Sequence, residues 1–248
     1  MKKLTRLNFC VVSLLFALSA TSFLQAQPCY LSRIIEADGD TISILYNGDN
    51  HISSIAKNSI VKTNSSGNII EIIHDKAAAT SFARATFIYD NNNNLILYEQ
   101  FDKGNTKPSF ITKFTYNSFN QLTETKSDVL VGENYFYGYR VFNYTNTTTK
   151  NPSTIKTYSG DAHSKIGNPD ETITLTYDDK KTIGYINPLD DFNPFTTHNV
   201  ITAAVVEVGA KPKTEIFTYQ YNSFGYPISK TEKEGERIFV TAYSYTCK

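Results

Sequence analysis

Hydrophobic and polar residues alternate one by one in short stretches along most of the chain. In KFTY at 113–116 the two aromatic residues alternate with Lys and Thr, and in TITLTY at 172–177 threonines alternate with Ile, Leu and Tyr. A period of two among β-branched and aromatic residues is typical of a half-buried β-strand. The best helical candidate, at 75–85, is short and weakly periodic. We therefore expect an all-β chain.

Turn-forming residues join these stretches, and one turn phrase occurs twice. YNSFNQLTETK begins at Tyr116 and YNSFGYPISKTEK begins at Tyr221. Asn222 suits the first position of a type I turn, and Gly225 lies where a left-handed residue closes the loop with a bulge. Asn120 holds that place in the other copy, and asparagine tolerates this region better than other non-glycine residues. The phrase predicts a β-hairpin turn, with the tyrosine packed on the neighbouring hairpin.

The same hairpin unit recurs with a period of roughly 25–30 residues. Aligned on the residue that ends the first arm, its key positions are 46, 63, 89, 116, 144, 177 and 221, with Thr63 in place of the usual tyrosine. Such a series predicts an antiparallel meander of about a dozen strands, which must curl, split or close. Closure also removes exposed edges. The expected fold is therefore a long meander of hairpin repeats, curved or closed into a barrel.

Residues 1–26 have the features of an export signal. Basic residues precede an apolar run at 11–20, and Ala26 suits the last position before cleavage. The run is too short to span a bilayer and no second long run follows, so no transmembrane helix is expected. The residues before Cys29 do not form a lipobox, which argues against a lipid anchor. We expect export to the periplasm, cell surface or medium, with 27–248 as one β-hairpin-repeat domain.

Cys29 and Cys247 remain after removal of the signal, one at each end of the domain. Export places them in an oxidising compartment, where disulfides form and persist. We therefore expect a disulfide that ties the two ends together, as a closed barrel would need. A redox or metal pair is less favoured, because the two cysteines lack C-x-x-C spacing.

Charge and motifs argue against several functional classes. Without the signal, 21 basic residues stand against 24 acidic ones, which is not the balance of a nucleic-acid binder. No G-x-S-x-G, Walker or H-E-x-x-H motif occurs. The four histidines, His51, His74, His163 and His198, lack the short spacing of metal ligands. We expect no cofactor and no metal, and the missing catalytic motifs favour a non-enzymatic role.

The strongest irregular feature is an insertion at 184–209, GYINPLDDFNPFTTHNVITAAVVEVG. Long loops in compact domains are often functional. An acidic pair, two aromatics and a histidine suit a carbohydrate or metal site, so the candidate ligand-binding residues are Asp190, Asp191, Phe192, Phe195 and His198. The alternative is a crossover or plug at one end of the barrel, anchored by the two phenylalanines. The run YFYGY at 135–139 is likewise either a ligand-stacking platform or a covered strand.

Two resemblances rest on these residues. The pattern of Tyr, Asp or Asn, a turn, and Leu or Ile resembles the YD-type repeats of bacterial Rhs and teneurin-like proteins, although the usual turn glycine occurs only at Gly67 and Gly225. The signal, the hairpin repeats and the segment INPLDDFNPF together resemble an uncharacterised family of secreted bacterial domains with a porin-like fold. That resemblance covers most of 27–248. It implies a fold, and it brings no activity or site residues.

These observations favour an exported, non-enzymatic β-repeat protein that binds a ligand or partner, such as a glycan or a cell-surface protein. One alternative is a secreted hydrolase with a carboxylate site near the insertion. Glycoside hydrolysis needs two carboxylates at a defined separation. The candidates are Asp178, Asp179, Asp190 and Glu207.

An outer-membrane barrel is the other alternative, since 17 Tyr and 16 Phe could supply aromatic girdles. Strict alternation places Glu124 and Lys126 on the same face as Leu122. Charges on a lipid-facing surface are costly at mid-bilayer. This placement argues against the membrane alternative.

Overall fold

The computed structural model describes residues 29–55, 59–74, 83–131, 134–160, 167–182 and 196–247. These residues form 16 strands and no helix, which confirms the all-β prediction. The strands are β1 (Cys29–Ile35), β2 (Thr41–Tyr46), β3 (Ile52–Ile55), β4 (Ser59–Thr63), β5 (Ile69–His74), β6 (Arg84–Tyr89), β7 (Leu95–Phe101), β8 (Phe110–Tyr116), β9 (Leu122–Val131), β10 (Asn134–Asn143), β11 (Thr154–Gly160), β12 (Glu171–Tyr177), β13 (Val200–Glu207), β14 (Lys213–Tyr221), β15 (Pro227–Glu234) and β16 (Arg237–Cys247). The expected signal at 1–26 lies outside the described residues. So does most of the helical candidate, whose Arg84 and Ala85 belong to β6.

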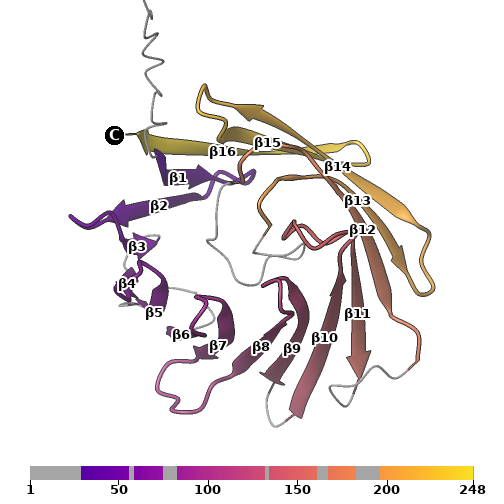
Figure 1. Cartoon of the computed structure of the whole chain (residues 1–248), viewed down its shortest axis with the longest axis horizontal. Helices are drawn as coiled ribbons and strands as arrows, with labels where there is room; N and C mark the ends of the chain where they lie inside the picture. The colour runs from indigo at the N-terminus through magenta and orange to yellow at the C-terminus, as the bar shows by residue number, and fades with distance from the viewer. Residues whose placement is uncertain are drawn as a thin grey trace, which may run out of the picture.

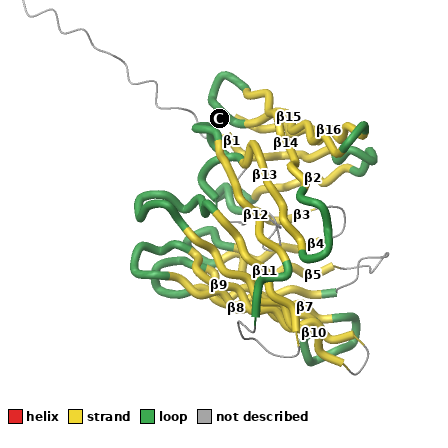
Figure 2. The backbone as a smooth tube through the Cα atoms, turned by 90° about the vertical axis from the view of Figure 1, so that its right-hand side faces the viewer, coloured by secondary structure: helices red, strands yellow, loops and turns green. Residues whose placement is uncertain are grey.

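The strands form a single antiparallel meander. Successive strands are paired from β4 through β16, β16 is paired with β1, and the order ends at β2 and β3. The sheet curls until β3 lies beside β4, which makes a nearly closed barrel (Figure 1). Figure 2 shows the strands running across the wall, with connecting loops gathered at its two ends. The predicted meander is confirmed, with more strands than the turn phrases alone suggest.

A disulfide joins the first and last strands of the barrel. Cys29 in β1 lies directly opposite Cys247 in β16, and their sulfur atoms are bonded at 2.04 Å. The pairing of β1 with β16 continues along the whole of β1, as far as Ile35 opposite Ala242. The predicted disulfide is therefore confirmed, and it lies at one end of an already paired ladder.

The seam of the barrel lies between β3 and β4. No ladder joins these strands within the described ranges. A side chain takes its place: Ser59 Oγ accepts from the Ile55 amide at 2.9 Å and donates to the Ile55 carbonyl oxygen. In the neighbouring turns, the ring of His51 lies against Gly67, where an added Cβ would come within 3.0 Å of it. Side-chain contacts thus close the barrel at this one place.

Five hairpins close with the predicted turn. The Oδ1 atom of an Asn or Asp accepts hydrogen bonds from the backbone amides two and four residues later. Asn117 accepts in this way from Phe119 at 2.9 Å and from Gln121 at 3.0 Å. The third residue after it has a left-handed φ, 57° at Asn120 and 80° at Gly225. The turns begin at Asn47, Asn64, Asp90, Asn117 and Asn222. Turn chemistry, rather than a chance repeat, explains the recurring phrase.

A β-bulge follows each of these turns and decides which face each side chain takes. In the β8–β9 hairpin the register shifts at Thr123, so Thr125, 9% exposed, shares the buried face with Leu122. Glu124 and Lys126 therefore lie on the opposite face. Their predicted placement beside Leu122 was wrong, because alternation cannot reveal one extra residue in a strand.

The buried face lines the inside of the barrel. One cluster of buried side chains extends from β4 to β14, and it includes Phe87, Leu95 and Phe114. A smaller cluster is formed by β1, β2 and β16, and Ile52 of β3 packs against both. The two clusters therefore meet through Ile52, on the β3 side of the seam.

Tyrosines near the turn end of the barrel tie each hairpin to the one before it. We call this contact the tyrosine clamp: a hydroxyl donates to a backbone carbonyl oxygen at or near the start of the preceding strand, as Tyr116 does to Leu95 at 2.9 Å. The other clamps are Tyr46–Leu31, Tyr89–Ile69, Tyr144–Leu122, Tyr177–Pro152, Tyr219–Val200 and Tyr245–Pro227. Thr63, the exception in the repeat, is at this position in β4 beside the seam.

The aromatic run at 135–139 lies within β10. Its member Tyr139 is 5% exposed, its ring lies 5.8 Å from the ring of Tyr158, and its hydroxyl donates to Glu124 Oε1 at 2.5 Å. A ring so thoroughly covered does not offer a free stacking surface. Tyr139 therefore favours the covered-strand interpretation over the ligand-stacking platform.

Candidate functional site

The insertion predicted to carry a site is described only near its ends. Asp190, Asp191, Phe192 and Phe195 lie outside the described residues, so their role stays a prediction. His198 is half-buried, and its Nδ1 lies 2.7 Å from Asn151 Nδ2. The Thr197 amide donates to Asn151 Oδ1 at 2.8 Å. The structure thus brings His198 to the loop between β10 and β11.

The residues on either side of the insertion make the hydrogen bonds of an ordinary turn. The Asp178 amide donates to the Asn199 carbonyl oxygen at 3.1 Å, as the Asp90 amide donates to that of Asn94 at 2.9 Å. Asn199 Nδ2 donates to Asp178 Oδ2 at 3.1 Å, and the equivalent bond from Asn94 is 3.0 Å long. The partners are four residues apart in one turn and 21 apart in the other. The hydrogen bonds of the turn, which we call the turn frame, are therefore kept although the chain between the two partners is longer.

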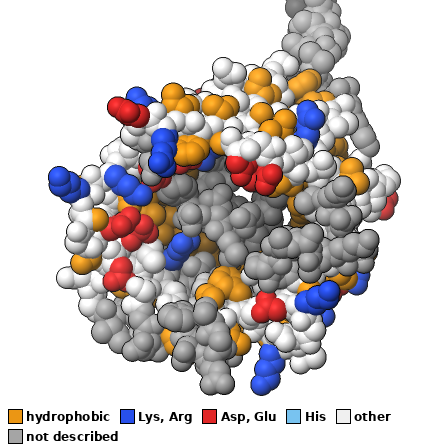
Figure 3. Space-filling view, turned by 180° about the vertical axis from the view of Figure 1, so that it is seen from behind, with side chains coloured by type: hydrophobic (Ala, Val, Ile, Leu, Met, Phe, Trp, Pro, Cys, Tyr) orange, Lys and Arg blue, Asp and Glu red, His pale blue; other side chains and the backbone are white. Residues whose placement is uncertain are grey.

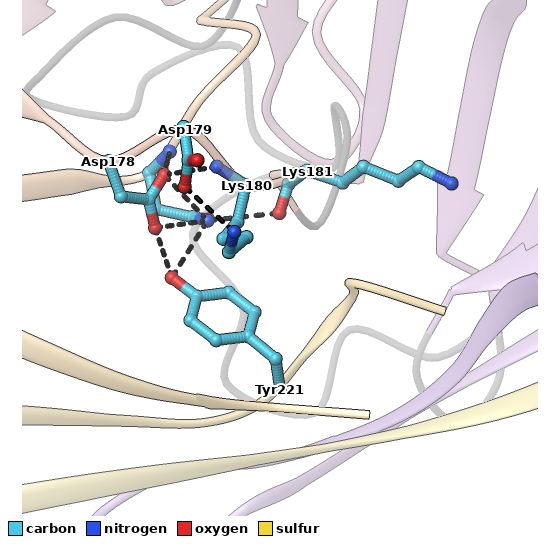
Figure 4. A network of polar contacts seen from close by, with 6 residues as sticks. Asp178, Asp179, Lys180, Lys181 and Tyr221 are labelled. Carbon is cyan, nitrogen blue, oxygen red and sulfur yellow. Dashed lines mark hydrogen bonds and ion pairs between the residues drawn. The ribbon is translucent and has the colours of Figure 1, made fainter. Parts of the chain in front are cut away.

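Tyr221 adds a hydrogen bond from its hydroxyl to this frame. Its hydroxyl donates to Asp178 Oδ2 and also lies 3.4 Å from Asn199 Nδ2 (Figure 4). Burial and the adjacent Asp178 carboxylate raise the pKa of Tyr221, so it remains a donor. Tyr219, two residues earlier, makes the clamp to Val200 at 3.0 Å. The repeat alignment placed Tyr221 at the position that ends the first arm, and β14 does end there, although the clamp itself is made by Tyr219.

Three of the four candidate carboxylates, Asp178, Asp179 and Glu207, lie within the described residues, and each has a polar partner there. Asp178 holds the turn frame, and exposed Asp179 pairs with Lys180 Nζ at 2.9 Å. Glu207 Oε1 lies 3.9 Å from Lys213 Nζ. Among the residues that the structure describes, no group of three His, Cys, Asp or Glu side chains could hold a metal.

A pocket of about 280 Å³ opens at the turn end of the barrel, near the seam. We call it the turn-end pocket. Its walls come from four successive hairpins and β3, and each wall residue lies at the start of a strand, at the end of one, or in a turn. The lining residues are Ile52, Gly67, Asn68, Ile69, Tyr89, Asn93, Asn94, Leu95, Tyr116, Asn120, Leu122, Tyr144 and Lys150.

Side-chain amides join the turns along the rim of this pocket. Asn68 Nδ2 donates to Asn93 Oδ1 at 3.1 Å, and Asn94 Nδ2 donates to Asn120 Oδ1 at 3.0 Å. Asn93 and Asn120 both have left-handed φ values, 61° and 57°. The same backbone conformation therefore presents both amides in the same way.

The tyrosines of the pocket are neutral donors. Burial raises the pKa of Tyr89 to about 12. Burial, followed by the nearby Asp90, Tyr144 and Tyr89, raises the pKa of Tyr116 further. Both hydroxyls are committed to clamps, so the rings offer apolar surface and the amides offer hydrogen bonds. Such a wall suits a ligand with an apolar face and hydroxyl groups.

The sequence analysis did not single out this pocket. The residues that line it recur in the repeat, since Asn and Tyr occupy the same positions in successive turns. Those residues were interpreted as turn formers, which they are. Only the curvature of the sheet shows that successive turns face one cavity.

Comparison with known proteins supports the fold. No protein-family model and no curated protein sequence matches the chain. A porin-like protein from Bacteroides vulgatus ATCC 8482 is similar, with TM-score 0.60 and 12% identity over 88% of this chain and 99% of that one. A porin-like protein from Bacteroides uniformis ATCC 8492 has TM-score 0.53 and 12% identity over 88% and 95%. At this identity the similarity concerns the porin-like β fold alone.

The YD-type resemblance and the secreted-family resemblance therefore stay predictions. Within the described ranges, no helix is long and apolar enough to span a membrane. The disulfide and the porin-like neighbours are compatible with an exported protein.

Proposed function

We propose that this is an exported, non-enzymatic binding protein and that its turn-end pocket takes a glycan. The observation that carries the proposal is the composition of the pocket: aliphatic side chains, tyrosine rings and side-chain amides from successive hairpins. Sugars present apolar C–H faces and hydroxyl groups together. An apolar wall with a few placed polar groups is the usual form of a small-molecule site.

The hydrolase alternative has less support. Among the described residues, Glu171 and Glu207 form a pair of carboxylates that lie directly opposite each other on β12 and β13. Glu171 Oε1 accepts from Thr157 Oγ1 at 3.2 Å, and Glu207 lies near Lys213. These partners account for both groups without a catalytic role.

The outer-membrane alternative also has less support. On the outer face, Lys62 Nζ lies 2.6 Å from Glu71, and Arg84 Nη1 lies 4.0 Å from the same carboxylate. Lys113 and Lys126 are directly opposite each other across β8 and β9. Charges at such positions are costly in a bilayer. On the face drawn in Figure 3, described side chains of both charge signs are scattered around the rim.

A thermal-shift screen of the exported, processed protein tests the proposal. A ligand that binds only the folded state at 100 times its Kd adds about 2.7 kcal/mol of stability. For a domain of this size the melting temperature should rise by roughly 5–10 °C. The panel contains neutral and acidic glycans, metals and lipids, with bovine serum albumin as the protein control. A saturable shift with a glycan supports the proposal, and its absence across all the glycans would contradict it.

A further inference from the structure

The wall of the turn-end pocket repeats itself. The β6–β7 hairpin supplies Tyr89, Asn93 and Leu95, and the β8–β9 hairpin supplies Tyr116, Asn120 and Leu122 in equivalent positions. On either side of them the neighbouring hairpins contribute Ile69 and Tyr144. The pocket is therefore a short row of similar subsites.

The interval between subsites follows from sheet geometry. Equivalent residues in adjacent hairpins lie two strands apart, and neighbouring strands are about 4.7–4.9 Å apart. The subsites therefore repeat at about 9–10 Å. That interval is close to the length of two sugar units in an extended chain.

Each subsite also has a side-chain amide donor, held at the same position of the same type of turn. Asn93 and Asn120 accept from Asn68 and Asn94 through Oδ1, so each retains an Nδ2 group with two N–H donors. Their similar φ values give these groups similar orientations. Of the side chains that line the pocket, Lys150 is the one that carries a formal charge. A mainly neutral, repeated wall matches a neutral ligand with a repeated structure.

We propose that the pocket binds a linear neutral oligosaccharide in register with the hairpin repeat, one disaccharide unit for each turn. The proposal rests on the glycan function proposed above and specifies its ligand. A polyproline II peptide has a repeat of about 9.3 Å and is the main competitor. Its carbonyl oxygens can accept from the Nδ2 groups, but proline brings no N–H donor. A sugar hydroxyl can accept from Nδ2 and also donate to the second lone pair of Oδ1.

Calorimetry with a length series tests the proposal. The probes are oligosaccharides of one to six units from β-1,4-glucan, β-1,3-glucan, xylan and mannan, with a proline-rich decapeptide as competitor. We expect one series to bind with an affinity that rises from one to four units and then levels off. Asn93→Gly and Asn120→Gly each keep the left-handed turn while removing the amide, and each should weaken tetrasaccharide binding about fivefold.

Asn50→Gly is the matched control, because Asn50 has a φ of 62° in an equivalent turn and does not line the pocket. It should leave binding unchanged. Absence of binding by all four series would contradict the glycan function itself. Binding that does not depend on length, an equal loss in Asn50→Gly, or tighter binding of the decapeptide would overturn the register proposal alone.

Discussion

The hydroxyl of Tyr116 donates to the carbonyl oxygen of Leu95 at 2.9 Å, and this contact joins two successive hairpins. Seven tyrosines make the equivalent bond around the barrel. The barrel therefore has a ring of side-chain bonds beside its backbone ladder. This ring is incomplete at the seam, where the corresponding residue is Thr63.

Removing one clamp should destabilise the protein. In Tyr116→Phe the ring remains and the hydrogen bond is lost, so the free energy of unfolding should fall by about 1 kcal/mol. Urea denaturation measures the change. Tyr158→Phe is the control, because the Tyr158 ring contacts Tyr139 and no clamp depends on its hydroxyl. If both variants lost the same free energy of unfolding, the clamp would not be a source of stability.

Adding the missing clamp should strengthen the seam. In Thr63→Tyr a hydroxyl could reach the start of β3, as it does in the other hairpins, and the free energy of unfolding should rise by about 1 kcal/mol. Hydrogen exchange should slow in β3 and β4 and stay unchanged in β8 and β9. A fall in stability would show that the seam has no room for the ring.

Loss of the disulfide should be costly. The pair Cys29→Ser and Cys247→Ser removes the cross-link between β1 and β16. Removing a native disulfide from a secreted domain typically costs about 2–5 kcal/mol. Thermal unfolding measures the change, and the wild-type protein in reducing agent provides the comparison. Two free thiols in the wild-type protein under non-reducing conditions would contradict the bond itself.

Asp178 should matter more than its counterpart in an ordinary turn. Asp178→Ala removes the acceptor of the Asn199 amide, of Asn199 Nδ2 and of the Tyr221 hydroxyl. Asp90→Ala removes the equivalent turn contacts and no hydrogen bond from a tyrosine hydroxyl. We expect Asp178→Ala to be more destabilising, by about 1 kcal/mol. Urea denaturation of the two variants decides, and equal effects would deny Tyr221 a role at the insertion.

Stability should fall at high pH. Burial raises the pKa of Tyr89 in the folded state to about 12, above its ordinary value of 10.0. The unfolded chain therefore loses its proton first, so the stabilisation is complete below pH 10 and is lost as the pH rises toward 12. Urea denaturation at a series of pH values, with absorbance of tyrosinate, follows this loss. Tyr89→Phe should show a shallower decline than the wild type.

The hairpins of this protein could be predicted from the amino-acid sequence. The alternation of KFTY at 113–116 and the left-handed Asn120 and Gly225 are local properties, because strand period and turn φ depend on neighbouring residues alone. The pairing of Cys29 with Cys247 was also predictable, since two of the three cysteines remain once the expected signal is removed.

How these hairpins are arranged could be learned from the tertiary structure alone. One extra residue at Thr123 reverses the face of Glu124, and Tyr219 rather than Tyr221 makes the clamp, because register across strands fixes which side chain reaches a partner. The turn-end pocket likewise depends on sheet curvature, which brings Asn93 and Asn120 to one cavity although 27 residues separate them. Curvature arises from packing summed over the whole barrel, so no local pattern encodes it.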